Sequence, residues 1–194
     1  GLGTLPVGAV TGLAQRFGVL KDARVVLVLL SAVLVTIGFN VVYIFSAQLT
    51  QHATGGDGRL LALLLLLYGI GGVVGTALAG PVTDRFGSRP TAAVVIAAEV
   101  VVFVLLAVEE QSFLALAVLF AGWGVLAFGS VVPLQHRLVA VEPAAAGITL
   151  AWYSTAMYVG IAAAPVVGAL VLAGGVVLLP VAGAVAAGLA LVAF

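Results

Sequence analysis

The sequence has few charges and no cysteine. Of its 194 residues, seven are Lys or Arg and seven are Asp or Glu, so only 7% are charged and the formal net charge is zero. A soluble domain has about 25% charged residues because its surface must face water. The lack of cysteine excludes disulfides, thiolate metal sites and cysteine nucleophiles. The lack of net positive charge argues against a nucleic-acid partner. The small number of charged residues argues against a soluble enzyme.

Apolar residues are abundant instead. They make up 64% of the chain, and the mean hydropathy is +1.36. A helix needs roughly 20 apolar residues to cross about 30 Å of hydrocarbon. Six apolar stretches come near that length, at 25–47, 60–80, 91–108, 113–132, 146–172 and 175–194. Because 60–67 is nearly all Leu and does not alternate, helices are favoured over a barrel. We therefore predict an all-α membrane protein with six spanning helices at 25–194.

Basic residues predict the orientation, because cytoplasmic loops contain an excess of Lys and Arg. Only Arg59 falls on the opposite side if the N-terminus is cytoplasmic. The residues then placed inside are Arg16, Lys21, Arg24, Arg85, Arg89 and Arg137. Glu109 and Glu110 fall outside. We expect an integral protein of the plasma (inner) membrane, in contact with lipid, with both ends of this chain cytoplasmic.

Residues 80–89, GPVTDRFGSR, connect the second and third stretches. This segment resembles a gating loop of the major facilitator superfamily, whose pattern is G-x-x-x-D-R-x-G-R-[RK]. The matching residues are Gly80, Asp84, Arg85, Gly87 and Arg89, whereas Ser88 stands where the family has Arg. Asp84 can cap a helix or pair with Arg85 or Arg89. The charges then act as a latch between two helix bundles, or they only anchor this side of the protein.

Further similarities place the chain in the second half of a transporter. Residues 123–137 and 158–168 resemble helices ten and eleven of the twelve-helix drug:proton antiporter branch, which includes sugar- and drug-efflux permeases. Residues 1–24 then form the tail of the cytoplasmic loop between the halves. The chain starts with Gly1, so we expect a missing N-terminal six-helix half. A first-half assignment stays open, because 160–169 approaches the motif G-x-x-x-G-P-x-x-G-G, although 113–132 lacks the Arg that it would require.

Small residues recur at helical spacing in two stretches. Gly71 and Gly75 form a G-x-x-x-G pair, and Gly160 and Gly168 share a face of the fifth stretch. Helices in lipid associate by close packing, so such faces predict helix contacts. Pro165 removes a helical hydrogen bond and predicts a kink that can serve as a hinge. Close packing of the helices is enough to explain these small residues. The resemblance to the transporter family adds the alternative that they also let one helix slide along another.

Polar groups within membrane spans are costly and are therefore candidates for a substrate cavity. Thr36, Asn40 and Tyr43 fall on one helix face, and Trp123 and Tyr158 belong to other stretches. The resemblance places these helices against a central cavity that binds a small-molecule substrate. The alternatives are that the aromatic side chains lie at the membrane interface and that Asn40 bonds a neighbouring helix.

Glu99 is the one charged residue in the middle of a stretch. Burial there favours its protonated form, so Glu99 is a candidate for proton coupling. Against this, the family places its helix at the outer face of the bundle, where a neutral acid could bond another helix. His52 and His136 have no partner at metal-ligand spacing, and no phosphate-binding loop is present. We therefore predict no metal, no cofactor and no catalytic residues.

The combined prediction is the C-terminal half of a proton-coupled exporter of small molecules. By resemblance, two halves rock about a site near the membrane midplane. One alternative is a stand-alone six-helix protein that homodimerises in a structural or accessory role. Another is a membrane-embedded enzyme, which would require clustered His, Asp or Ser within the spans.

Overall fold

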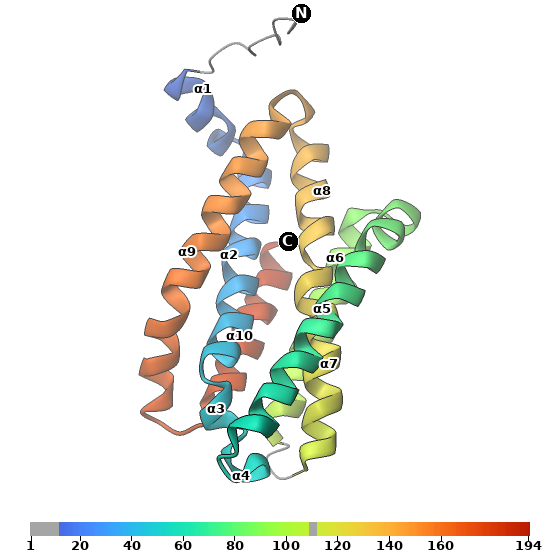
Figure 1. Cartoon of the computed structure of the whole chain (residues 1–194). Coiled ribbons are helices and arrows are strands. Elements are labelled where there is room, and N and C mark those ends of the chain that lie inside the picture. Colours follow the sequence, from blue (N-terminus) through green and yellow to red (C-terminus); the bar gives the residue numbers. More distant parts are fainter. Residues whose placement is uncertain (1–11, 109–111) are drawn as a thin grey trace, which may run out of the picture.

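The computed structural model describes residues 12–108 and 112–194. Helices and short connections account for these residues, with no strand among them, which confirms the all-α prediction. The helices run up and down as one bundle (Figure 1). The long helices are α2 (Ala23–Ile44), α5 (Gly58–Phe86), α6 (Ser88–Val108), α7 (Phe113–Gly129), α8 (Val131–Val141), α9 (Ala146–Leu172) and α10 (Leu178–Ala193). The short ones are α1 (Leu13–Gly18), η1 (Val19–Lys21), α3 (Ser46–Leu49), α4 (Gln51–Thr54) and η2 (Pro143–Ala145).

In the described part of the chain, five helical segments are long and apolar enough to cross a membrane. They are α2, α5, α6, the continuous run of α7 and α8, and η2 with α9. The sixth predicted span corresponds to α10, which is apolar but has only 16 residues. At 1.5 Å per residue, α10 is roughly 24 Å long and falls just short of the hydrocarbon thickness. The six predicted stretches are therefore all helical, and the last is shorter than expected.

The predicted connection between the second and third spans is mostly helix. Instead of ending at position 80, α5 continues through Pro81 to Phe86. A helix of 29 residues is about 43 Å long, so its last turns extend beyond the hydrocarbon. Gly87 alone makes the turn, with φ at 86°, and its N–H donates to the carbonyl of Thr83 at 2.8 Å. Only glycine adopts this backbone conformation without strain.

The polar segment 135–141, between the fourth and fifth predicted stretches, is helical and not a simple connection. It belongs to α8, which continues the line of α7 after a break near Ser130. Leu134 and Leu138 lie one turn apart and are buried against α2 and α9, whereas His136 is exposed. The polar residues of this segment therefore lie on the outer face of an amphipathic helix.

Two sets of helices form the bundle. In one set α2 packs against both α9 and α10, and in the other α5 packs against α7. Contacts of α10 with α6 join the two sets, and α6 also packs on α7. The largest core cluster includes Tyr68, Phe103, Phe120 and Trp123 from α5, α6 and α7. A second cluster, around Tyr153, joins α2, α8 and α9.

Glycines allow the closest helix contacts. A Cβ at Gly71 would overlap the carbonyl of Ala121, and a Cβ at Gly75 would overlap that of Val125. On the opposite helix, a Cβ at Gly124 would overlap the carbonyl of Tyr68. The role of Gly124 was missed in the sequence, although the GWG at 122–124 is a visible small-residue signal. These three glycines bring the backbones of α5 and α7 into contact.

The small residues of α9 lie against α2 and its C-cap residue Phe45. A Cβ at Gly160 would lie 2.7 Å from the Cβ of Thr36, and a Cβ at Gly168 would overlap the ring of Phe45. The helix continues without interruption through Pro165, which is exposed. Its role as a hinge stays a prediction.

Candidate functional site

The residues of the predicted gating loop lie around the junction of α5 and α6. Gly80, Asp84 and Arg85 belong to the last turns of α5, Gly87 is the turn, and Arg89 is in the first turn of α6. The four residues from Asp84 to Gly87 are exposed, as is Arg89.

No ion pair joins Asp84 to Arg85 or Arg89. Within 12–108 and 112–194, the one salt bridge joins Arg24 to Asp22 at 2.9 Å. Arg85 instead places its guanidinium carbon 5.3 Å from the centre of the Phe86 ring. The charges of this motif are therefore free to interact with groups outside the chain.

The basic residues gather at one end of the bundle. Figure 1 shows α1, the α5–α6 junction and the α8–α9 junction together at the upper end. These segments, η1 and the start of α2 contain six of the seven Lys and Arg residues, and Arg59 lies at the start of α5. We call this the basic end. At this end Asp22 caps α2, and its hydrogen bonds to Arg24 lower the pKa of the Asp22 carboxyl. Glu109 and Glu110 lie outside the described residues.

The five predicted cavity residues separate into two groups. Tyr43 and Tyr158 are 42% and 64% exposed, and Asn40 is half-buried. Thr36 is buried against Gly160, and its carbonyl accepts a hydrogen bond from Asn40 Nδ2 at 2.9 Å. Trp123 is fully buried in the core. Only Asn40, Tyr43 and Tyr158 are therefore accessible at the surface of this chain.

One stripe on the outer face of α9 has small and polar residues, whereas Val159, Val166 and Leu170 are exposed elsewhere on this helix. Along this helix the exposed residues at helical spacing are Gly147, Ala151, Thr155, Tyr158 and Ala162. Large aliphatic residues cover the exposed faces of α6 and α10, namely Val94, Val101, Val104, Leu105, Val108, Val181, Val185, Leu189 and Val192. Aliphatic side chains suit contact with lipid, whereas small and polar ones are typical of contacts with protein or water within a membrane.

An aromatic cluster surrounds Trp123. Its ring centroid lies 4.4 Å from Tyr68, 5.5 Å from Phe120 and 5.9 Å from Phe103. Tyr68 also contacts Tyr43 at 5.4 Å and Phe128 at 5.7 Å. The indole nitrogen of Trp123 has no hydrogen-bond partner in the described chain. Sequence reasoning missed Tyr68, although it lies one turn before Gly71 and Gly72 on the same face of α5.

Glu99 faces the interior of the bundle. Its side chain is fully buried, and neither carboxyl oxygen has a hydrogen-bond partner within the described ranges. The resemblance had suggested an outer position for this helix, but Glu99 lies on its inner face. No group of three His, Asp or Glu side chains that could hold a metal ion occurs among the described residues.

Comparison with known proteins finds transporters. The chain is 26% identical over 145 residues to the uncharacterized MFS-type transporter YbcL of Bacillus subtilis (strain 168), a match that covers 75% of this chain. It is 28% identical over 186 residues, or 95% of its length, to the inner membrane transport protein YdhP of Escherichia coli O157:H7. The homologues of this chain are MFS-type transporters. Together with the apolar helices, this makes the chain an integral membrane protein related to transporters.

The chain spans less than half the length of these MFS-type relatives. The matched region is 37% of YbcL and 48% of YdhP. No family model matches the chain, and no solved structure matches it.

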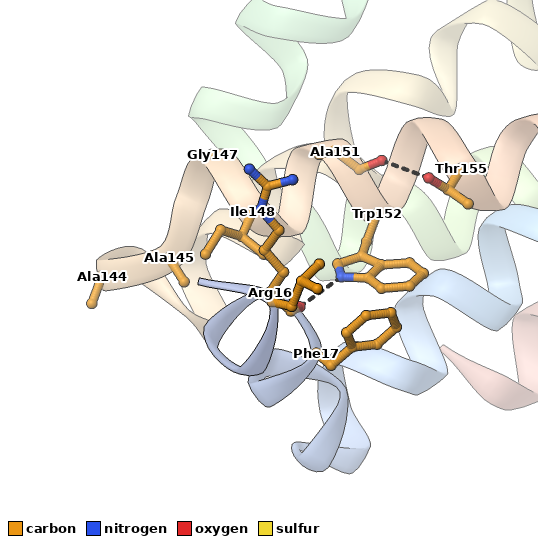
Figure 2. Close-up of a pocket in the computed structure, with 10 residues that line it drawn as sticks. Arg16, Phe17, Ala144, Ala145, Gly147, Ile148, Ala151, Trp152 and Thr155 are labelled. Atoms are coloured by element: carbon orange, nitrogen blue, oxygen red, sulfur yellow. Dashed lines mark hydrogen bonds between the residues drawn. The ribbon is translucent and has the colours of Figure 1, made fainter. Parts of the chain in front are cut away.

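The chain also has a cavity at its basic end, between α1 and the start of α9 (Figure 2). Its volume is about 730 Å³, and Arg16, Phe17, Trp152 and Thr155 are among the residues that line it. Trp152 Nε1 donates to the carbonyl of Arg16 at 2.8 Å, and the Phe17 ring meets the indole edge-on at 5.4 Å. These contacts hold α1 against α9.

Proposed function

We propose that the chain forms one six-helix half of a secondary active transporter, and specifically the C-terminal half. The observation that supports this most directly is the stripe of small and polar residues on the outer face of α9, defined by Gly147, Ala151, Thr155, Tyr158 and Ala162. Such a face is poorly suited to lipid and well suited to a second bundle with water between the two. The chain matches less than half of the length of each relative, which agrees with a further half in the whole protein.

The substrate route in this proposal runs along the surface between the two halves. Tyr158 of α9 contributes to that surface, and so do Asn40 and Tyr43 of α2. Their hydroxyl and amide groups can hydrogen-bond a polar part of a substrate, and the tyrosine rings can contact an apolar part. The substrate is therefore a small molecule of mixed polarity, such as a drug or a sugar-like metabolite. Alternating access by rocking of the halves moves it across, and the resemblance to the drug:proton antiporter branch gives the direction as export.

The gating motif forms contacts between the halves at the basic end. Asp84, Arg85 and Arg89 are exposed and have no ionic partner in the described chain. In one conformation they pair with charges of the other half, and in the other conformation these pairs break. Because Lys and Arg gather at the basic end, we place this end in the cytoplasm. The relative YdhP, an inner membrane transport protein, supports the plasma membrane as the location. Residues 1–24 then form the tail of the loop between the halves.

Glu99 is the proposed proton-coupling residue. An ionised carboxylate without a partner is costly to bury, so its charge state and the packing around it depend on each other. Both Glu99 oxygens lack a partner in the described chain, and the side chain is fully buried. In this proposal the group is protonated in one conformation and loses its proton in the other.

Cysteine labelling tests the water-filled surface. Since the sequence has no cysteine, a single introduced thiol is the only one in this chain. We expect Tyr158→Cys to react with a membrane-impermeant maleimide because thiols ionise in water, and we expect substrate to slow this reaction. The matched control is Val185→Cys, a residue 56% exposed on the aliphatic face of α10, which lipid should shield. Equal labelling at both positions, or no labelling at Tyr158→Cys, would contradict the proposal.

The alternative of a stand-alone homodimer uses the same face of α9. In that case two copies of this chain would meet there, and a bifunctional thiol reagent would join two Tyr158→Cys chains. A transporter that contains one copy of this chain gives no such cross-link.

A further inference from the structure

The cavity between α1 and α9 has the size and the lining of a small-molecule site. Its volume of about 730 Å³ falls within the range of about 300–1,000 Å³ that is usual for such sites. Much of its wall is apolar, with residues such as Leu13, Ala145 and Ile148, and Arg16 is the one charged side chain among the described residues that line it. Small-molecule sites typically combine an apolar wall with a few polar groups that orient the ligand.

The positive charge of Arg16 has no counter-charge in this cavity. No acidic side chain occurs among the described residues that line it, and the first turn of α9 contains none. Glu142, just before η2, makes no ion pair with Arg16, since the one salt bridge within 12–108 and 112–194 joins Arg24 to Asp22. A guanidinium group has five N–H donors in an arrangement that suits carboxylates and phosphates. The cavity therefore favours a ligand with an anionic group.

Two aromatic rings form another part of the same wall. Phe17 and Trp152 both line the cavity, and their rings meet edge-on with centroids 5.4 Å apart. Figure 2 shows the side chain of Arg16 extending along the start of α9 toward Gly147, away from these rings. Because the charge and the rings lie in different parts of the cavity, the ligand that fits it has an anionic group at one end and an apolar body at the other.

The cavity is continuous with the proposed substrate surface. Gly147, Ala151 and Thr155 line the cavity, and the same three residues belong to the stripe of small and polar residues that continues along α9 to Tyr158. A ligand in the cavity therefore already contacts the surface along which the proposed substrate route runs. This continuity favours a transported molecule over a membrane lipid as the occupant.

We propose that this cavity is the cytoplasmic entrance site of the substrate route and that it binds amphipathic organic anions, in which an anionic group is attached to an aromatic or apolar body. This inference rests on the proposed function, because the cavity is an entrance only if a second half completes the route. Arg16 binds the anionic group, and the rings of Phe17 and Trp152 contact the apolar body. The 2.8 Å hydrogen bond from Trp152 Nε1 to the Arg16 carbonyl holds the two parts of the site together.

Equilibrium binding of radiolabelled naphthoate to the full-length protein, in nanodiscs of neutral lipid, tests the site. Naphthoate has one carboxylate on a two-ring aromatic body, and naphthamide is its neutral counterpart. We expect Arg16→Gln to weaken naphthoate binding on the order of tenfold, because a charge-assisted hydrogen bond is lost at a position exposed to water. The same variant should leave naphthamide binding unchanged.

Lys21→Gln is the matched control. It removes one positive charge from the same basic end, but Lys21 is exposed on η1 and does not line the cavity. The affinity for naphthoate should therefore stay within the error of the measurement. This comparison separates a specific contact with Arg16 from a general attraction of anions to the basic end.

Three results would overturn the entrance site. The first two are an unchanged naphthoate affinity in Arg16→Gln, and equal weakening in Arg16→Gln and Lys21→Gln. The third is competition by phosphatidylglycerol in the nanodiscs that lowers naphthoate affinity in the unaltered protein and not in Arg16→Gln. That result would identify a lipid headgroup, and not a transported anion, as the occupant of the cavity.

Maleimide labelling of Tyr158→Cys distinguishes this failure from that of the proposed function. If naphthoate affinity does not depend on Arg16, while Tyr158→Cys is labelled and Val185→Cys is not, the route between the halves stands and only its entrance site is wrong. If naphthoate affinity depends on Arg16 but Tyr158→Cys is not labelled, the cavity binds anions, and both the route and the role of the cavity as its entrance are wrong.

Discussion

Gly75 of α5 lies directly against the backbone carbonyl of Val125 of α7, so closely that a Cβ at position 75 would overlap the carbonyl oxygen. The obstacle is backbone, which cannot move aside as a flexible side chain can. The position therefore requires glycine if α5 and α7 are to keep their separation.

We predict that Gly75→Val destabilises the protein by about 1–3 kcal/mol, the usual cost of overpacking. The matched control is Gly69→Ala on the same helix, where no atom would lie within 4 Å of the new Cβ. It should be neutral or stabilising by about 0.5–1 kcal/mol because alanine favours helix over glycine. Thermal unfolding in detergent measures both, and equal melting temperatures would show that the close contact does not matter.

Replacing Glu99 by leucine should raise the melting temperature. A buried polar group without a partner costs about 1–3 kcal/mol, and both Glu99 oxygens lack one in the described residues. Leucine fills a similar volume without that cost. If Glu99 couples protons, Glu99→Leu should also lose proton-driven uptake or efflux in liposomes. A variant that is both less stable and fully active would contradict both statements.

Neutralising Asp84 should affect transport without affecting stability. Asp84 is exposed and has no ion pair in the described part of the chain, so we expect Asp84→Asn to change stability by no more than about 0.5 kcal/mol. Asp57→Ala is the contrasting variant, since Asp57 caps α5 by accepting a 2.7 Å hydrogen bond from the Arg59 N–H. It should cost about 1 kcal/mol. Thermal unfolding and transport assays on both variants test this separation.

Trp152→Phe should loosen α1 from α9. The substitution keeps an aromatic ring for Phe17 but removes the 2.8 Å hydrogen bond to the Arg16 carbonyl. A net loss of about 0.5–1.5 kcal/mol exposes the backbone near Arg16 and Lys21 more often. Trypsin should therefore cut there faster than in the unaltered protein. Tyr158→Phe on the same helix, which does not line this cavity, should leave the rate of cleavage unchanged.

The ends of the helices were harder to predict from the sequence than the existence of the helices. The apolar stretches located every span, but α5 and α8 extend beyond them, because Asp84, Arg85 and His136 lie on helical turns and not in loops. A spanning helix can continue past the hydrocarbon layer when water solvates its polar side chains. Hydropathy marks where hydrocarbon ends, which is not where the hydrogen-bonded turns end.

The sequence by itself determined the membrane environment, the six apolar helices, the basic end and the motif at 80–89. These features follow from the bilayer, which acts on each segment through its own length, charge and hydropathy. Only the tertiary structure decided that Tyr43 and Tyr158 are exposed and that Trp123 and Glu99 are buried. The helices are apolar around most of their circumference, so their pattern does not identify an inner face. Helix rotation depends on contacts between distant residues, such as Gly75 with Val125.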